Sequence, residues 1–255
     1  MRAYFNKLAR DVEQKKALPL IYPLLLALIA GAIFSFSLAP FEQWYIALLS
    51  PALLYAALHK RSPVHAFAIG LSYGIGLWFV GAFWLYTSIH VYGDTAAPLA
   101  ILMIAVMAVL MGLFSAFQAW SYRRFFPETP LTFAPLWVLF EWAKTWVFTG
   151  FPWLFAGYAF TGYFLDGYAP LFGVFGVSFV VIILACALVE LCRKRLIWLV
   201  PSAVLLIGAW AASQIEFVKQ KTTAPLSVSL IQGNIPQDLK WLTEYQGKTL
   251  SIYAD

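Results

Sequence analysis

The stretch from residue 64 to residue 89 reads VHAFAIGLSYGIGLWFVGAFWLYTSI and contains no Asp, Glu, Lys or Arg. An α-helix that crosses a bilayer needs about 20 consecutive apolar residues, and this stretch is long enough. Lys60 and Arg61 stand just before it. Basic residues are typical of the cytoplasmic end of a membrane span. The stretch therefore predicts a membrane-spanning helix that starts on the cytoplasmic side.

Six further apolar runs share this character. They cover roughly residues 18–38, 44–58, 98–122, 131–148, 167–192 and 196–212. Counted along the chain, the first, third, fourth and sixth of the seven runs are long enough to span a bilayer on length alone, whereas the others need interfacial flanking residues to complete the crossing. The whole chain is 62% hydrophobic and only 11% charged, against about a quarter charged in soluble domains. We predict an α-helical polytopic membrane bundle of seven spans.

Basic residues occupy every second gap between these runs. The basic positions are Arg2, Lys7, Arg10, Lys15 and Lys16, then Lys60 and Arg61, then Arg123 and Arg124, then Arg193, Lys194 and Arg195. The intervening loops, at 39–43, 90–97 and 149–166, contain neither Lys nor Arg. Because Lys- and Arg-rich loops stay in the cytoplasm, we expect a cytoplasmic N-terminus and expect the residues after 212 on the outer side.

The pattern changes after the seventh run. Leu226, Val228 and Leu230 alternate with serines, which is typical of a half-buried strand, and helical spacing with a capping pattern follows from Thr243. One strand and one short helix cannot bury enough apolar surface to be stable alone. We therefore expect four parts: a basic N-terminus (1–17), a transmembrane domain (18–212), a linker (213–225), and only the start of an outer α/β domain (226–255).

Glu141 and Lys144 stand three apart in the fifth run, on neighbouring positions of one helix face. Charges within a membrane are costly, face the protein interior or a water-filled cavity, and often mark function. Two interpretations stay open, a structural ion pair and a functional site. Gly70 and Gly74 lie on the third run, and small residues four apart predict close helix packing.

Several classes of function are disfavoured. The net charge of +5 does not indicate a nucleic-acid partner, because the basic residues form short clusters and no continuous face. Cys186 and Cys192 stand six apart, on different helix faces and outside metal-ligand spacing. We expect neither a metal nor a cofactor, and no catalytic residue can be assigned within this chain.

Four segments together resemble the apolipoprotein N-acyltransferases. They are FSLAPF at 36–41, GLSYGIGLWFVGAFWLYTSI at 70–89, FEWAKTWVFTGFPWL at 140–154, and SLIQGNIPQDLKW at 229–241. The resemblance implies a bacterial inner-membrane enzyme with a periplasmic, nitrilase-like α/β sandwich after residue 212. It further implies acyl transfer from a phospholipid, through a cysteine thioester, to the amine of a diacylglyceryl-modified apolipoprotein. The Glu-Lys-Cys triad of the family has no match here and is expected beyond residue 255.

The resemblance also implies lipid-contacting residues. Trp241 matches a tryptophan near the active-site mouth, and Trp153 matches one at the membrane-side entry. Glu141 and Lys144 match an acidic and a basic position, although the family more often has Arg at the second. The loop at 149–166 is too apolar to be solvated, so we expect it to form part of an acyl-chain groove. The residues expected to bind lipid are Phe151, Pro152, Trp153, Trp241, Glu141 and Lys144.

Two other classes of function stay open. Buried charges among glycine-rich spans would also suit a transporter or channel, although no inverted repeat is visible. A non-catalytic membrane anchor or assembly factor would need only the helices and an outer binding domain. The residues that follow position 255 in a longer chain would discriminate these alternatives from an acyltransferase.

Overall fold

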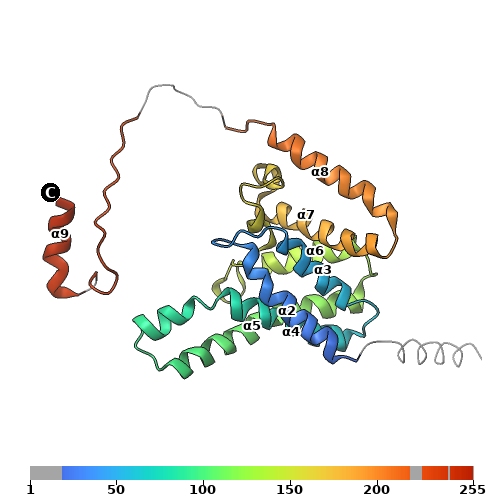
Figure 1. Cartoon of the computed structure of the whole chain (residues 1–255), viewed down its shortest axis with the longest axis horizontal. Helices are drawn as coiled ribbons and strands as arrows, with labels where there is room; N and C mark the ends of the chain where they lie inside the picture. The colour runs from blue at the N-terminus through green and yellow to red at the C-terminus, as the bar shows by residue number, and fades with distance from the viewer. Residues whose placement is uncertain (1–18, 219–225, 241, 255) are drawn as a thin grey trace, which may run out of the picture.

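The structure is a computed structural model, and it describes residues 19–218, 226–240 and 242–254. Each of the seven apolar runs carries one α-helix (Figure 1). The helices are α2 (Ile21–Phe34), α3 (Ile46–Ala57), α4 (Pro63–Gly81), α5 (Ala97–Phe125), α6 (Pro130–Ala143), α7 (Ala169–Cys192) and α8 (Leu199–Ser213). The predicted N-terminal segment at 1–17 lies outside the described residues.

Among the residues that the structure describes, four segments are long and apolar enough to cross a membrane. They are Pro63–Gly81, Ala97–Phe125, Asp166–Cys192 and Leu196–Ser213. The first run was expected to qualify on length, but α2 has only 14 residues and a 3-10 turn follows it. The helix ends there because the Ser37 hydroxyl donates to the Phe34 carbonyl at 2.6 Å. The seventh run was expected to be short, but it qualifies, because the 3-10 turn Leu196–Trp198 and α8 together form the 18-residue segment Leu196–Ser213.

Local sequence signals set two helix starts. At α4, the Ser62 hydroxyl accepts a hydrogen bond from the His65 N–H at 3.3 Å, and Pro63 is the first helical residue. At α6, the Thr129 hydroxyl accepts from the Leu131 N–H at 3.0 Å, again just before a proline. A capping hydroxyl satisfies a free N–H, and proline lacks the N–H that would go unpaired.

Glycines bring α2, α4 and α5 into close contact, and the close packing predicted at Gly70 and Gly74 is confirmed between α4 and α5. A Cβ at Gly74 would lie 2.5 Å from the Cα of Gly112 on α5. Where α2 meets α4, a Cβ at Gly31 of α2 would lie 1.9 Å from the Tyr73 carbonyl oxygen of α4. Any side chain at these positions would push the helix backbones apart. The glycines therefore fix the positions of three neighbouring helices.

Helix α7 packs against α3 and α6, and the chain between α6 and α7 folds over it. Within this connection the 3-10 turn η4 (Ala156–Phe160) is largely buried. The Gly157 N–H donates to the Ser178 hydroxyl of α7 at 2.8 Å. A Cβ at Gly157 would lie 2.4 Å from the Val174 carbonyl oxygen. The segment at 149–166 is thus a packed element, which confirms that it is no solvated loop.

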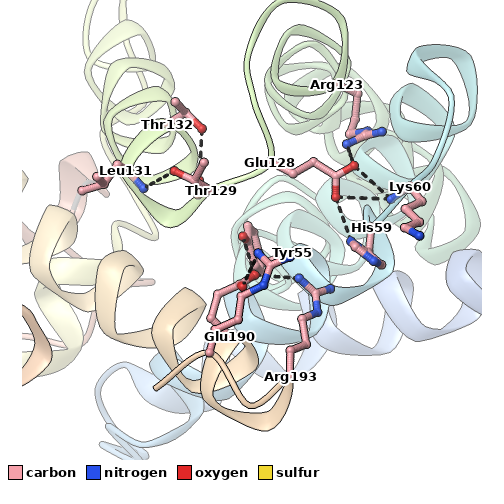
Figure 2. A network of polar contacts seen from close by, with 11 residues as sticks. Tyr55, His59, Lys60, Arg123, Glu128, Thr129, Leu131, Thr132, Glu190 and Arg193 are labelled. Carbon is pink, nitrogen blue, oxygen red and sulfur yellow. Dashed lines mark hydrogen bonds and ion pairs between the residues drawn. The ribbon is translucent and has the colours of Figure 1, made fainter. Parts of the chain in front are cut away.

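Three of the predicted basic loops meet at one end of the bundle, which we call the basic end (residues 58–62, 123–129 and 193–195). Figure 2 shows two carboxylates at its centre. Glu128 binds Arg123, the His59 ring and the Lys60 N–H. Glu190 binds Arg193 at 2.7 Å and the Tyr55 hydroxyl at 2.9 Å. Loops from α3, α5 and α7 therefore share one end, as the charge alternation predicted, while the side of the membrane stays a prediction.

The predicted strand at 226–231 is wrong for this structure. Within the described residues no β-strand is assigned, and 226–231 is exposed chain without regular structure. A strand needs a neighbouring strand to accept its hydrogen bonds, and the described segments offer none. The predicted helix that follows is confirmed as α9 (Gln246–Ala254), which begins after a 3-10 turn that contains Thr243. Figure 1 shows α9 apart from the bundle.

Candidate functional site

A cavity of about 960 Å³ opens at the end of α4 that lies away from the basic end. We call it the groove. Three segments line it, namely residues 35–42 after α2, residues 79–84 at the end of α4, and residues 152–163 between α6 and α7. Its side chains are mainly aromatic and aliphatic, and the FSLAPF motif forms one wall. A volume of this size is at the upper end for small-molecule sites.

A row of aromatic rings leads from the groove into the bundle. Trp84 and Trp153 stack with ring centres 5.1 Å apart, and Trp153 stacks on Phe151 at 5.5 Å. Phe151 in turn contacts Trp78, which is buried, at 5.2 Å. Trp153 keeps 45% of its surface exposed. Trp84 and Trp153 thus line the groove, and Phe151 packs against Trp153.

Glu141 is buried on α6, with 2% of its surface exposed. Its Oε1 accepts hydrogen bonds from the Trp137 indole N–H at 2.8 Å and from the Ala156 backbone N–H at 2.9 Å. The carboxylate therefore ties α6 to the start of η4. Its second oxygen, Oε2, has no hydrogen-bond partner.

Lys144, the C-cap residue that follows α6, is also buried. Its ammonium lies 5.1 Å from the ring centre of Phe155 and 5.6 Å from that of Trp78. Such positions over aromatic faces attract a cation. In the described part of the chain, Lys144 makes no ion pair with Glu141, so the direct pairing proposed from sequence is absent. The reason is that Glu141 is held by Trp137 and η4, while the lysine turns toward the rings.

The backbone behind the groove is strained. Phe148, Thr149 and Leu154 have φ angles of 52°, 73° and 60°, in the left-handed region. Non-glycine residues adopt this region at a cost, and β-branched threonine rarely does so. Gly150 has φ +88°, and a Cβ there would lie 2.1 Å from the Thr145 carbonyl oxygen. Strain of this kind clusters at functional sites.

The structure brings together only some of the predicted site residues. Pro152 and Trp153 line the groove, and Phe151 lies behind Trp153. Glu141 and Lys144 are buried beyond the groove wall, and Trp241 lies outside the described residues. The wall formed by residues 35–42 was not predicted, although the FSLAPF motif was a signal for it. Among the described residues, no cluster of three His, Cys, Asp or Glu side chains could hold a metal ion.

Comparison with known proteins gives one consistent result. Residues 30–187 match the family model described as the apolipoprotein N-acyltransferase N-terminal domain. The apolipoprotein N-acyltransferase of Azotobacter vinelandii is 40% identical over 242 residues, which cover 91% of this chain and 47% of that protein. The protein of the same name from Coxiella burnetii is 36% identical over 239 residues, covering 89% of this chain and 49% of that protein. The chain thus spans about half the length of these curated relatives.

Proposed function

Because this chain belongs to the apolipoprotein N-acyltransferase family, we propose that it forms the membrane part of an enzyme that acylates lipoproteins. In this proposal an acyl chain passes from a phospholipid, through a cysteine thioester, to the N-terminal diacylglyceryl-cysteine amine of an apolipoprotein. The proposed acyl donor and the proposed acceptor are both lipids anchored in a bilayer. A protein that receives them needs an apolar site reachable from the membrane.

The observation that carries this proposal is the groove. Its walls are mainly apolar, and the stacked Trp84 and Trp153 both line it. Acyl chains have no hydrogen-bonding groups. Packing against such walls is therefore favourable, either because the chain leaves water or because it replaces another lipid. The strained turn at 148–150 and the buried contacts of 154–160 hold Trp153 in place before any ligand arrives. A preformed wall lowers the entropy cost of binding.

The chemical steps need groups that we do not assign to this chain. Acyl transfer through a thioester requires a reactive thiolate, a base and donors for the oxyanion. Cys186 is buried within α7 and Cys192 stands at the opposite end of that helix from the groove segments. We place the thiolate and its partners in the half of the relatives that this chain does not match. In this proposal, the residues of this chain bind and orient the lipid.

We also propose the membrane orientation predicted by the charge pattern. The basic end faces the cytoplasm of a bacterial inner membrane, because Lys- and Arg-rich loops stay there. The groove then opens toward the outer leaflet, and α8 delivers the residues after 212 to the periplasm. This orientation puts the groove on the same side as the following segment. The orientation is tested with two variants that carry a single cysteine, one at residue 43 and one at residue 194. A membrane-impermeant maleimide should label only the cysteine at position 43 in intact cells.

A transporter is the rival function, because Glu141 and Lys144 are buried charges. The space beside them amounts to only about 10 Å³, however, and Leu154 separates it from the groove. A solute path needs a continuous polar cavity, and a space of this size holds about one water molecule. The geometry therefore favours lipid binding in the groove over transport past the buried charges.

The function is tested with a phospholipid that carries a photoreactive diazirine on one acyl chain. We expect cross-links to peptides of residues 152–163 in the full-length protein. Trp153→Ala should lower both the cross-linking and acyl transfer by about tenfold or more, since a central tryptophan contributes a large share of a binding free energy. Trp142→Ala is the matched control, because Trp142 is similarly exposed, at 48%, and does not line the groove.

The outcomes separate the functions. Equal labelling of the Trp153→Ala and Trp142→Ala variants would contradict lipid binding in the groove. Cross-linking without any acyl transfer by the wild-type protein would contradict the enzymatic part of the proposal and favour a membrane anchor or assembly factor.

A further inference from the structure

A second, smaller cavity lies between α4, α5 and α6 and has a volume of about 10 Å³. Apolar side chains form most of its wall. Four polar residues line it as well, namely Ser115 and Gln118 of α5, Glu141 of α6 and Lys144 just after α6. It is separate from the groove, and nothing in the proposed lipid-binding function uses it.

Two of these polar groups lack partners. The Gln118 Nε2 and the Glu141 Oε2 are both fully buried, and neither has a hydrogen-bond partner in the structure. Gln118 itself is 5% exposed and Glu141 2% exposed. An unpaired buried polar group costs about 1–3 kcal/mol, more when it is charged, so native proteins nearly always satisfy such groups. Here a donor and an acceptor without partners belong to two residues that line the same small space.

The size and the charges of this space specify what can fill it. A cavity of about 10–15 Å³ is the smallest that holds one water molecule, and a buried water typically makes two to four hydrogen bonds. A water can accept from the Gln118 amide and from the Lys144 ammonium, and it can donate to the Glu141 carboxylate. A metal cation would instead meet the like charge of Lys144. We propose that this cavity is a binding site for one ordered water molecule that links Gln118, Glu141 and Lys144.

Leu154 isolates this water site from the groove. Its side chain lines both cavities, and it is 7% exposed. A Cβ at Gly81 would lie 2.6 Å from the Leu154 Cδ1, so α4 holds the leucine closely from the other side. One side chain thus separates an apolar groove from a hydrated pair of charges. The groove can therefore stay apolar although two ionisable groups lie just behind its wall.

The water site is tested by hydroxyl-radical footprinting of the full-length protein, read residue by residue by mass spectrometry. Radiolysis of a bound water oxidises the side chains beside it, even where bulk solvent does not reach. Leu77 lines the cavity and is 3% exposed, whereas Leu54 is 1% exposed and does not line it. We expect Leu77 to be oxidised several-fold faster than Leu54. Equal rates for the two leucines would overturn the proposal.

A variant pair links the oxidation to this site. Gln118→Leu removes one partner of the water and should lower the oxidation of Leu77 to that of Leu54. Gln43→Leu makes the same substitution at an exposed position and should leave Leu77 unchanged. If Gln118→Leu does not fold, Gln118→Asn replaces it, because the shorter side chain withdraws the amide from the water and should also lower the oxidation of Leu77. Oxidation of Leu77 that persists in the Gln118 variants, or that changes when sodium is exchanged for lithium or potassium, would overturn the assignment to a bound water.

Discussion

The ammonium of Lys144 lies 5.1 Å from the ring centre of Phe155, at the start of η4. The nearest acidic residue in sequence, Glu141, is one helical turn away, yet it accepts its hydrogen bonds from Trp137 and from the Ala156 N–H. Both charges face the same small cavity without touching. Each is therefore stabilised by its own neighbours, and their mutual attraction acts across the cavity.

The first prediction concerns this attraction. Glu141→Gln leaves the lysine as an uncompensated buried charge, and Lys144→Met does the same to the glutamate, so each single variant should cost about 3–5 kcal/mol in the free energy of unfolding. The double variant removes both charges and should cost clearly less than the sum. Denaturant unfolding in detergent measures all three variants. Costs that add within about 0.5 kcal/mol would contradict the coupling.

The second prediction concerns the turn behind Trp153. Gly150 and Gly162 both have positive φ, of +88° and +76°, but only a Cβ at Gly150 would clash, 2.1 Å from the Thr145 carbonyl oxygen. Gly162→Ala should therefore cost about 1–2 kcal/mol, the price of a left-handed alanine. Gly150→Ala should cost more, because the turn must shift, and it should separate Trp153 from Trp84.

Thermal unfolding gives the two stabilities, and tryptophan fluorescence reports the loss of the Trp84–Trp153 stack. The Gly162→Ala variant is the matched control for the backbone effect. Equal stabilities and equal spectra would show that the Thr145 contact does not constrain the turn.

The helices were the predictable part of this fold. Long apolar runs such as 64–89 and 98–122 have few alternatives to a helix in a bilayer, because every backbone group must find its partner inside the segment. The close contacts of Gly70 and Gly74 followed from their spacing alone. The gathering of the basic loops at one end followed from the alternation of Lys and Arg.

The site was predictable only in part. Pro152 and Trp153 were expected beside a groove and do line it. The contact of Lys144 with Phe155 was not predictable, because the chain reaches residue 155 only after left-handed backbone angles at Phe148 and Thr149, which these residues rarely adopt. Of the partners of Glu190, Arg193 and Arg195 are its neighbours in sequence, and the i,i+3 spacing of Glu190 and Arg193 was a local signal for that pair. The Tyr55 hydroxyl was not predictable, because it comes from α3 and no local pattern reports such a contact.

The third prediction concerns Glu190, which is completely buried at the basic end. Its carboxylate binds Arg193, Arg195 and the Tyr55 hydroxyl at 2.7, 2.8 and 2.9 Å. Glu190→Gln removes the charge that both arginines share and should cost about 3 kcal/mol in the free energy of unfolding. Tyr55→Phe removes one hydrogen bond and should cost about 1 kcal/mol.

Glu216→Gln is the control for the change of charge, because Glu216 is exposed beyond α8 and its replacement should stay within about 0.5 kcal/mol of the wild type. Unfolding in detergent again gives the comparison. A Glu190→Gln variant as stable as Glu216→Gln would mean that the arginines do not depend on Glu190.

The fourth prediction concerns pH and His59, whose Nδ1 lies 2.8 Å from Glu128 at the basic end (Figure 2). Burial of the ring lowers its pKa, and the nearby charges of Arg193, Lys60 and Arg123 lower it further, whereas Glu190 acts in the opposite direction. Glu128 is already neutralised by Arg123. We therefore expect a neutral ring that donates its Nδ1–H to Glu128 at neutral pH.

The sign of the pH effect follows from this lowered pKa. Below the ordinary histidine pKa of about 6.5, the unfolded chain binds a proton at His59 that the folded protein still excludes. The free energy of unfolding should therefore fall as the pH drops below about 6.5. The contribution of His59 to this fall should end once the pH is below the pKa of His59 in the folded protein. Melting temperatures between pH 8 and pH 5 measure the slope, and His59→Asn should make it shallower. A slope that is identical in the variant would show that His59 does not couple folding to pH.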